Sequence, residues 1–191
     1  PINTPTPLPS FHPGQHLSFS LPLNDGLNVR YYSLSDGPHP DHYRVSIKRA
    51  LPPRNAGPEV PPGLGSNHFH DKIQLGETVL TGQPAGDFCL DFRTKKSGPV
   101  VLLAGGIGIT PMVSISKMLN GIDYEDPVYL FYGVRGAHEV ALIDDLILVS
   151  RELKNINVYL CISGATEKVP DITKHEYIHA VTGMNKDGSP T

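Results

Sequence analysis

Residues 97–116, SGPVVLLAGGIGITPMVSIS, carry no charged side chain. The run is long enough to suggest a membrane-spanning helix, but Gly105, Gly106, Gly108 and Pro111 interrupt it. PVVLLAG instead predicts a buried strand, the glycines a tight turn, and TPMVSISKMLN a helix. A strand that enters a helix through glycines is typical of folds that bind ligands at the carboxyl ends of parallel strands.

The same alternation continues toward the C-terminus. PVYLFYGV reads as a second buried strand, EVALIDDLILVSREL as a second helix, and NVYLCISG as a third strand. Asp144 and Asp145 of the second helix are expected on its solvated face. Strands separated by helices predict a parallel α/β sheet over residues 98–191.

Residues 1–97 have a different rhythm. QHLSFSL, NVRYYSLS, YRVSIKRA, TVLTGQ and FCLDFR are short β-like runs separated by Pro and Gly turns, with SNHFHDKI as the one helical insert. Evenly spaced short strands predict an antiparallel β-barrel, closed or nearly closed. The predicted fold is therefore α/β plus all-β, an antiparallel barrel at 1–97 followed by a parallel α/β sheet at 98–191.

Composition restricts the class of function. Of the 191 residues, 39% are hydrophobic and 18% are charged, and the net charge is −3. A packed protein whose positive and negative charges are mixed lacks the excess of basic residues that is typical of binding to nucleic acid or to an anionic membrane. The opening PINTPTPLPS has neither the basic start nor the apolar core of a signal peptide, and is expected to be a linker or the edge of a longer protein.

The cysteines and histidines predict no metal centre. The two cysteines, Cys89 and Cys161, lie far apart and form no CxxC pair. His68 and His70 would point to different sides of a helix, so they could not chelate one ion. Without a disulfide framework, a cytoplasmic location is expected.

The glycine turn is a candidate phosphate site. Gly105, Gly106 and Gly108 would let the backbone turn tightly and approach a ligand closely. Thr110 is expected as the N-cap of the following helix and Pro111 as its first residue. Free amides and the helix dipole would then point toward an anion.

Arg30, within the strand NVRYYSLS, is the second unusual feature. A buried strand avoids an unpaired charge, and an exposed one has little use for Tyr31 and Tyr32 side by side. A planar, anionic ligand would explain the pattern, with arginine on the anion, tyrosine on the plane and Ser33 on the edge. The alternative is a surface arginine paired with Asp36 or Asp41.

Six segments, in the same order along the chain, resemble motifs of the ferredoxin reductase-like superfamily. Within it, they most resemble the reductase part of flavohaemoglobins. RYYS resembles the Arg-x-Tyr-Ser flavin motif, and GGIGITPM the Gly-Gly-x-Gly-x-Thr-Pro nicotinamide-dinucleotide loop. FHPGQHLSF resembles the Pro-Gly-Gln-Tyr segment, with His16 where tyrosine is usual. VPPGLGSNHFHD resembles the flavin phosphate loop, PAGDF the barrel-closing turn, and FYGVR with EVALIDDL the second nucleotide strand and helix.

The resemblance implies a role for each matching residue. Arg30 would pair with flavin phosphate, Tyr32 would lie on the isoalloxazine face, and Ser33 would hydrogen-bond near the hydride-accepting nitrogen. Thr110 would lie in the cleft against both cofactors, which makes Ser33 and Thr110 the expected catalytic residues. The expected cofactor-binding residues are His16, Arg30, Tyr31, Tyr32, Ser33, Ser46, Ile47, Lys48, Gly63, Gly65, Ser66, Asn67, Gly105, Gly106, Ile107, Gly108, Ile109, Thr110, Pro111 and Arg135.

The implied reaction is hydride transfer from NADH to FAD, followed by transfer of single electrons to an acceptor. The acceptor would be a separate protein or a fused haem or iron–sulfur domain outside this chain. NADPH is the less expected donor, because NADPH-using relatives carry Ser-Arg at the end of the third strand, where this chain has Ser163 and Gly164. Lys168 or Arg135 could instead bind the extra ribose phosphate of NADPH and so weaken the preference for NADH.

Three alternatives stay open. FMN could replace FAD, because no adenine pocket is legible. A non-catalytic flavin-binding module is a second alternative, because nothing after CISGATEK matches the Cys-Gly-Pro strand of the superfamily, so the nucleotide domain is expected to be C-terminally truncated. The third is a methyltransferase-like sheet with GGIGIT around S-adenosylmethionine. A methyltransferase-like sheet would need an acidic residue after the second strand, whereas this chain has GVR at 133–135.

Overall fold

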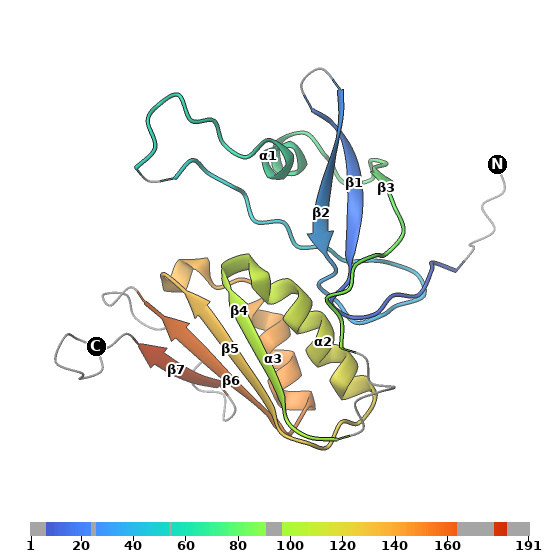
Figure 1. The fold of residues 1–191 in the computed structure, drawn as a ribbon, viewed down its shortest axis with the longest axis vertical. Helices are drawn as coiled ribbons and strands as arrows, with labels where there is room; N and C mark the ends of the chain where they lie inside the picture. The colour runs from blue at the N-terminus through green and yellow to red at the C-terminus, as the bar shows by residue number, and fades with distance from the viewer. Residues whose placement is uncertain (1–6, 24–25, 54, 91–96, 164–177, 183–191) are drawn as a thin grey trace.

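The computed structural model describes residues 7–23, 26–53, 55–90, 97–163 and 178–182. Figure 1 shows two units that follow one another along the chain. The first holds the antiparallel strands and the short helix α1, and the second holds a parallel sheet with two longer helices. This two-part architecture confirms the predicted fold class.

The first unit is built on a three-stranded antiparallel sheet. Strands β1 (His16–Leu23), β2 (Gly26–Ser33) and β3 (Leu80–Thr81) are arranged in the order β2-β1-β3. Helix α1 (Leu64–Asp71) packs against it through Phe69, whose ring meets those of Phe19 and Tyr32 edge-on. The buried residues of this core are Phe11, Leu17, Phe19, Leu21, Leu23 and Leu34.

Two predicted strands of this unit differ in the structure. Residues 43–50 form only an isolated bridge, between Val45 and Leu34. Their other groups bond to loop and side-chain atoms, as when Ser66 Oγ accepts the Ala50 amide and the His70 ring contacts the Ile47 carbonyl. Of the predicted strand 88–93, residues 88–90 are not in a strand and the rest lies outside the described residues.

The second unit is a parallel sheet of four described strands. Strands β4 (Val100–Gly105), β5 (Val128–Val134), β6 (Ile156–Ile162) and β7 (Ile178–Thr182) occur in that spatial order. Helices α2 (Ile109–Gly121) and α3 (Ile143–Glu152) make the first two crossovers. Because the strands progress in one direction, right-handed crossovers place both helices on one face. The sequence prediction missed β7.

Only one face of this sheet is buried by the described elements. In β5, Val128, Leu130 and Tyr132 are fully buried under the helices, whereas Phe131, between them in sequence, is exposed. On the open face the rings of Phe131 and Tyr159 stack with centroids 4.8 Å apart. The alternation of burial follows the period of two in a strand.

The two units meet through four charged side chains, which we call the interdomain ion cluster: Asp36, Arg44, Lys117 and Asp145. Lys117 Nζ of α2 lies 2.7 Å from Asp36 Oδ1 and 2.6 Å from Asp145 Oδ1. Arg44 Nη2 of the first unit lies 2.8 Å from Asp145 Oδ1 of α3. Asp145 is therefore not the solvated residue that its sequence suggested.

Candidate functional site

The glycine turn lies at the carboxyl end of β4. Gly105 ends the strand, Gly106–Gly108 form a single 3₁₀ turn (η1), and α2 follows at Ile109. Gly106 has a φ of +50°, a conformation that favours glycine. A Cβ atom added at Gly105, Gly106 or Gly108 would meet nothing within 4 Å. The backbone of the turn therefore borders open space, as close approach of a ligand requires.

The start of α2 corrects the predicted helix cap. Gly108, not Thr110, is the N-cap residue, and Pro111 is the third residue of the helix rather than the first. The η1 turn leads directly into α2, so the helical backbone begins closer to β4 than the sequence predicted. Pro111 is tolerated because the amides of a first helical turn have no partner within the helix. Thr110 is buried, and its Oγ1 donates to the Ile107 carbonyl at 3.1 Å.

This arrangement limits how the residues of the turn could touch a ligand. Ile109 is completely buried, so neither its side chain nor its backbone is open to a ligand in this arrangement. Ile107 instead lines a cavity between the two units. The hydroxyl proton of Thr110 is engaged within the turn, which leaves its oxygen as an acceptor.

Arg30 lies on the face of the first sheet that α1 covers. Its Cα pairs in register with that of buried Phe19, and residues paired across antiparallel strands share a face. Gly65 of α1 passes directly over Arg30, since a Cβ there would lie 2.8 Å from Arg30 Cγ. Arg30 therefore sits beneath the first turn of a helix whose N-cap, Gly63, makes no side-chain capping bond.

The surface ion pair weighed as an alternative for Arg30 does not form. Asp36 pairs with Arg44 and Lys117, and Asp41 approaches His39. Within the described part of the chain no carboxylate pairs with Arg30, and its Nη1 donates to the Val29 carbonyl at 2.9 Å. A half-buried guanidinium with spare donors beside a helix N-terminus can hold an anion.

Side chains around the start of α1 hold the loop itself. Ser66 Oγ donates to the Gly63 carbonyl at 3.2 Å and accepts the Ala50 amide at 3.0 Å. Asn67 Nδ2 donates to the carbonyls of Ala50 and Gly63, and its Oδ1 accepts from Arg49. These bonds leave the backbone amides of the first turn as the groups that could face a phosphate.

The aromatic residues of β2 separate onto two faces. Tyr32 shares the face of Arg30, and burial raises the pKa of its hydroxyl while the charge of Arg30 opposes that rise. Tyr31 points to the other face, where it is 65% exposed and meets the His16 ring edge-on at 5.1 Å. The structure thus groups Tyr32 with Arg30 and places Tyr31 with His16. Ser33, the last residue of β2, pairs in register with His16.

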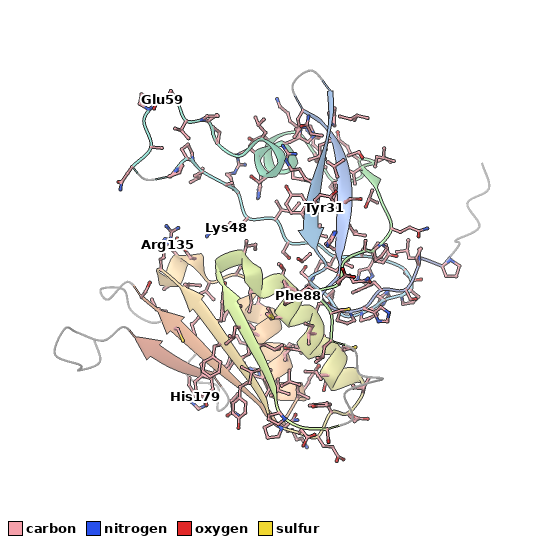
Figure 2. The ribbon with its side chains drawn as sticks, in the orientation of Figure 1. Tyr31, Lys48, Glu59, Phe88, Arg135 and His179 are labelled. Atoms are coloured by element: carbon pink, nitrogen blue, oxygen red, sulfur yellow. The ribbon has the colours of Figure 1, made fainter. Side chains whose placement is uncertain are left out.

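A cavity of about 750 Å³ lies between the two units. It brings together five residues that the sequence singles out: Ser46, Ile47 and Lys48 from the first unit, and Ile107 and Arg135 from the second. In Figure 2, Lys48 and Arg135 approach each other where the units meet. The remaining lining residues are Arg49, Ala50, Leu51, Pro52, Pro53, His138, Glu139, Val140 and Ala141.

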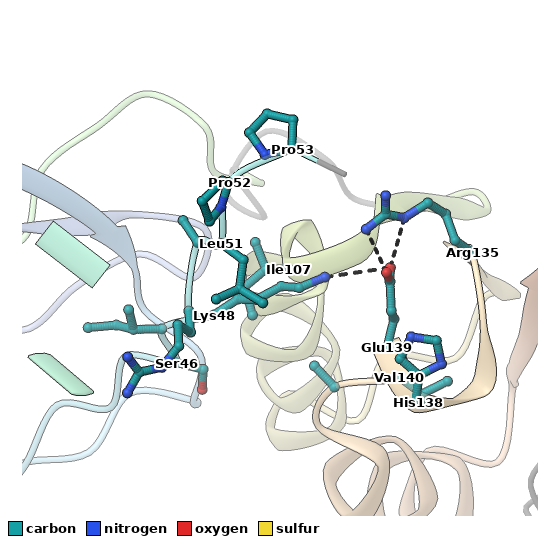
Figure 3. A pocket seen from close by; sticks show the side chains of 14 residues that line it. Ser46, Lys48, Leu51, Pro52, Pro53, Ile107, Arg135, His138, Glu139 and Val140 are labelled. Atoms are coloured by element: carbon teal, nitrogen blue, oxygen red, sulfur yellow. Dashed lines mark hydrogen bonds and ion pairs between the residues drawn. The ribbon is translucent and has the colours of Figure 1, made fainter. Parts of the chain in front are cut away.

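Glu139 joins the two sides of this cavity (Figure 3). Its Oε1 accepts from Arg135 Nη2 at 2.6 Å, and its Oε2 accepts from Arg135 Nε at 3.3 Å. Lys48 Nζ approaches the same Oε2 at 3.5 Å. The hydrogen bond from Arg135 is the main cause that holds the pKa of Glu139 below its usual value, so the carboxylate is ionised near neutral pH.

Sequence reasoning missed Glu139, although a signal was present. Glu139 follows Arg135 by four residues, and Arg135 comes directly after a buried strand. An opposite-charge pair at this spacing, at the carboxyl end of a parallel strand, marks a candidate polar site. Gly164 and Lys168, which bear on the choice between NADH and NADPH, lie outside the described residues.

Within the part of the chain that the structure describes, no group of three or more His, Cys, Asp or Glu residues is placed to hold a metal ion. No helix among the described residues is both long and apolar enough to cross a membrane.

Comparisons with known proteins agree with this geometry. Residues 102–180 match the family model described as an oxidoreductase NAD-binding domain. A flavohemoprotein of Bacillus cereus is 34% identical over 161 residues, which are 83% of this chain and 38% of that protein. The chain thus spans less than half the length of this relative.

Two solved structures share the fold. The flavohem-like FAD/NAD-binding domain of nitric oxide dioxygenase from Vibrio cholerae superposes with a TM-score of 0.74 and 24% identity, over 94% of this chain and 69% of that one. Flavohemoglobin from Malassezia yamatoensis, with bound FAD and heme, gives 0.72 and 22%, over 94% and 46%. Together with the sequence matches, they confirm the resemblance to the ferredoxin reductase-like superfamily.

Proposed function

We propose that this chain, whose residues 102–180 match an oxidoreductase NAD-binding domain, is the reductase unit of a flavoenzyme. In this proposal it binds FAD on residues 1–97 and NADH on residues 98–191. Bound together, the two cofactors would supply the redox chemistry, in which a hydride passes from NADH to FAD and single electrons then leave to an acceptor.

One observation carries the proposal: two features suited to phosphate, on different units, accompany a cavity between those units. Arg30 lies beneath the first turn of α1, and the glycine turn after β4 borders open space. The cavity between the units is lined from both sides. One dinucleotide, with its two phosphates, could bind to each unit, and the two dinucleotides would then be the donor and the acceptor of the redox reaction.

The residues of the first unit fit a flavin dinucleotide. Gly65 has no side chain where a Cβ would meet Arg30, so the guanidinium and the α1 amides can face one anion. Tyr32 shares that face and would lie against the flavin ring. Ser33 would donate a hydrogen bond at the ring edge, and Ser46, Ile47 and Lys48 would line its polar side.

The residues of the second unit fit a nicotinamide dinucleotide. The amides of Gly105–Gly108 would approach its phosphates, and the buried Thr110 would hold the turn in shape through its bond to Ile107. Direct hydride transfer needs no general acid or base, so the task of the protein is to orient two rings and to exclude water.

We also propose the partner and the location. Flavohemoglobin from Malassezia yamatoensis binds heme as well as FAD, which supports a haem domain, or another one-electron acceptor, as the partner of this chain. Cys89 and Cys161 are both free thiols. This state suits a reducing compartment, so the proposed location is the cytoplasm.

Flavin binding and reduction test the proposal directly. The purified protein, supplied separately with FAD and FMN and then dialysed, is expected to retain FAD and show flavin absorption bands. Anaerobic mixing with NADH in a stopped-flow spectrometer is expected to bleach those bands. Retention of FMN instead of FAD would change the cofactor, and bound flavin that NADH cannot bleach would point to the non-catalytic module. A colourless protein would overturn the proposal.

A further inference from the structure

Glu139 contacts two of the cations that line the interdomain cavity, one from each unit, as Figure 3 shows. It holds Arg135 through two contacts, of 2.6 Å and 3.3 Å, and lies 3.5 Å from Lys48. Its side chain is only 10% exposed, whereas that of Arg135 is 71% exposed. The carboxylate is thus the buried member of the group, and the guanidinium is the member that a ligand could reach.

The backbone around Glu139 is fixed from below. The buried Tyr132 of β5 accepts the Ala141 amide at 3.0 Å and donates to the Glu139 carbonyl at 3.5 Å. Residues 137–139 form a single 3₁₀ turn, η2, directly above that hydroxyl. The backbone that carries Glu139 is therefore held in place, and the carboxylate is kept beside Arg135 and Lys48 by its contacts with those two cations.

Arg135 also lies where the protein would contact the group that distinguishes NADPH from NADH. It follows the last residue of β5, and the Ser163 amide, one position beyond β6, donates to the Val134 carbonyl at 3.0 Å. Ligands of parallel sheets bind at this carboxyl edge. NADPH differs from NADH by one phosphate on the adenosine ribose, and an arginine at such an edge is the natural partner for that phosphate.

We propose that Glu139 is a selectivity residue that excludes ligands with the additional ribose phosphate by occupying Arg135. The inference rests on the proposed function, because it deepens the choice of dinucleotide at the same site. A phosphate dianion that approaches Arg135 would meet the repulsion of the Glu139 carboxylate and would have to compete with it for the guanidinium. A dinucleotide without that phosphate would meet no such repulsion.

Equilibrium binding of two probes tests this without turnover. Adenosine 5′-monophosphate and adenosine 2′,5′-bisphosphate differ only in the ribose phosphate, and both are titrated into the FAD-loaded protein by calorimetry. The unchanged protein is expected to bind the monophosphate at least as tightly as the bisphosphate. Glu139→Gln and Glu139→Ala are each expected to tighten bisphosphate binding by about tenfold or more, while monophosphate affinity changes by less than about twofold.

Glu152→Gln is the matched control. It makes the same chemical change at the end of α3, where Glu152 accepts from Asn120 and does not line the cavity. The expected effect on either probe is small. In the double variant Glu139→Gln with Arg135→Gln, the gain in bisphosphate affinity is expected to disappear, because the freed guanidinium is its source.

Distinct outcomes separate the two proposals. Unchanged relative affinity of the two probes in both Glu139 variants would overturn the role of Glu139 alone. Tighter bisphosphate binding by the unchanged protein would do the same. If neither probe binds and NADH does not bleach the flavin, the proposed function fails, and the role of Glu139 fails with it.

Discussion

At the scale of single residues, Arg30 shows how one glycine can create a place for a charge. The side chain is half-buried because its strand neighbour, Phe19, faces the core. Gly65 leaves room for it, since any Cβ there would lie 2.8 Å from Arg30 Cγ. The guanidinium is thereby kept at the first turn of α1 without a carboxylate partner among the described residues.

Arg30→Ala is therefore expected to weaken FAD binding while the fold is kept. Loss of a hydrogen bond to a charged group costs about 1.5–3 kcal/mol, which raises the dissociation constant roughly ten- to hundredfold. Flavin fluorescence titration measures that constant, and circular dichroism checks the fold. Arg151→Ala, which removes an exposed arginine from the last turn of α3, is expected to leave FAD affinity unchanged. Full flavin retention by Arg30→Ala would refute the phosphate role.

At the scale of elements, the interdomain ion cluster joins a loop of the first unit to two helices of the second. Burial alone raises the pKa of Asp36, but the hydrogen bond from Lys117 and the charges of Arg44 and Lys117 outweigh it and lower the pKa below the usual 3.8. A carboxyl with a lowered folded pKa stabilises the protein above its unfolded pKa, and this contribution is lost as the pH falls through the folded pKa.

We expect Asp36→Asn to destabilise the protein near neutral pH and to cost much less in acid. Urea unfolding of the two proteins at about pH 7 and at about pH 3 measures the difference in free energy of unfolding at each pH. Asp41→Asn is the control, since Asp41 is exposed and lies 3.9 Å from His39. A difference between Asp36→Asn and the unchanged protein that is the same at both pH values would argue against an ionised Asp36.

The elements also show where sequence reasoning succeeds. Unalternated apolar runs predicted β4, β5 and β6, because such runs are typical of the strands of parallel sheets, although the described elements cover only one face of this one. The segment 43–50 was wrongly predicted as a strand. Its β-like composition is real, but Ser66 takes the Ala50 amide and His70 the Ile47 carbonyl. Such long-range side-chain bonds leave no periodic signal in the sequence.

At the scale of the whole molecule, the buried side chains form two separate cores, and we propose that the chain divides between them, near the predicted boundary at residues 97 and 98. Leu21 is buried in the first core and Leu130 in the second. Between them the described contacts include the ion cluster and the pair of Lys48 with Glu139. Polar contacts of this kind are common between domains that keep their own cores.

Leu21→Ala and Leu130→Ala are expected to destabilise different parts of the chain. Each removes a fully buried side chain, at a cost of about 2–5 kcal/mol. Hydrogen exchange followed by mass spectrometry should show the loss of protection mainly in peptides of 7–90 for the first variant and of 98–163 for the second. Equal loss in both regions after either substitution would contradict two domains.

From the sequence we could predict only those parts of the candidate site whose residues lie close together along the chain. Gly105, Gly106 and Gly108 form such a motif, and so do Arg30 and Ser33. The spacing of Arg135 and Glu139 was a local signal, but the contact of Glu139 with Lys48, a residue far away in sequence, is visible only in the structure. That contact depends on how two units dock, which local patterns do not encode.

The ion cluster also has a consequence for the order in which the molecule assembles. Strands β4, β5 and β6 and the helices between them contact their neighbours along the chain, so each contact closes a short loop. Asp36 and Lys117 are 81 residues apart, and Arg44 and Asp145 are 101 apart. Closing long loops costs more chain entropy and slows the search. The cluster is therefore expected to form last, after each unit has folded, and to complete the cavity at the same moment.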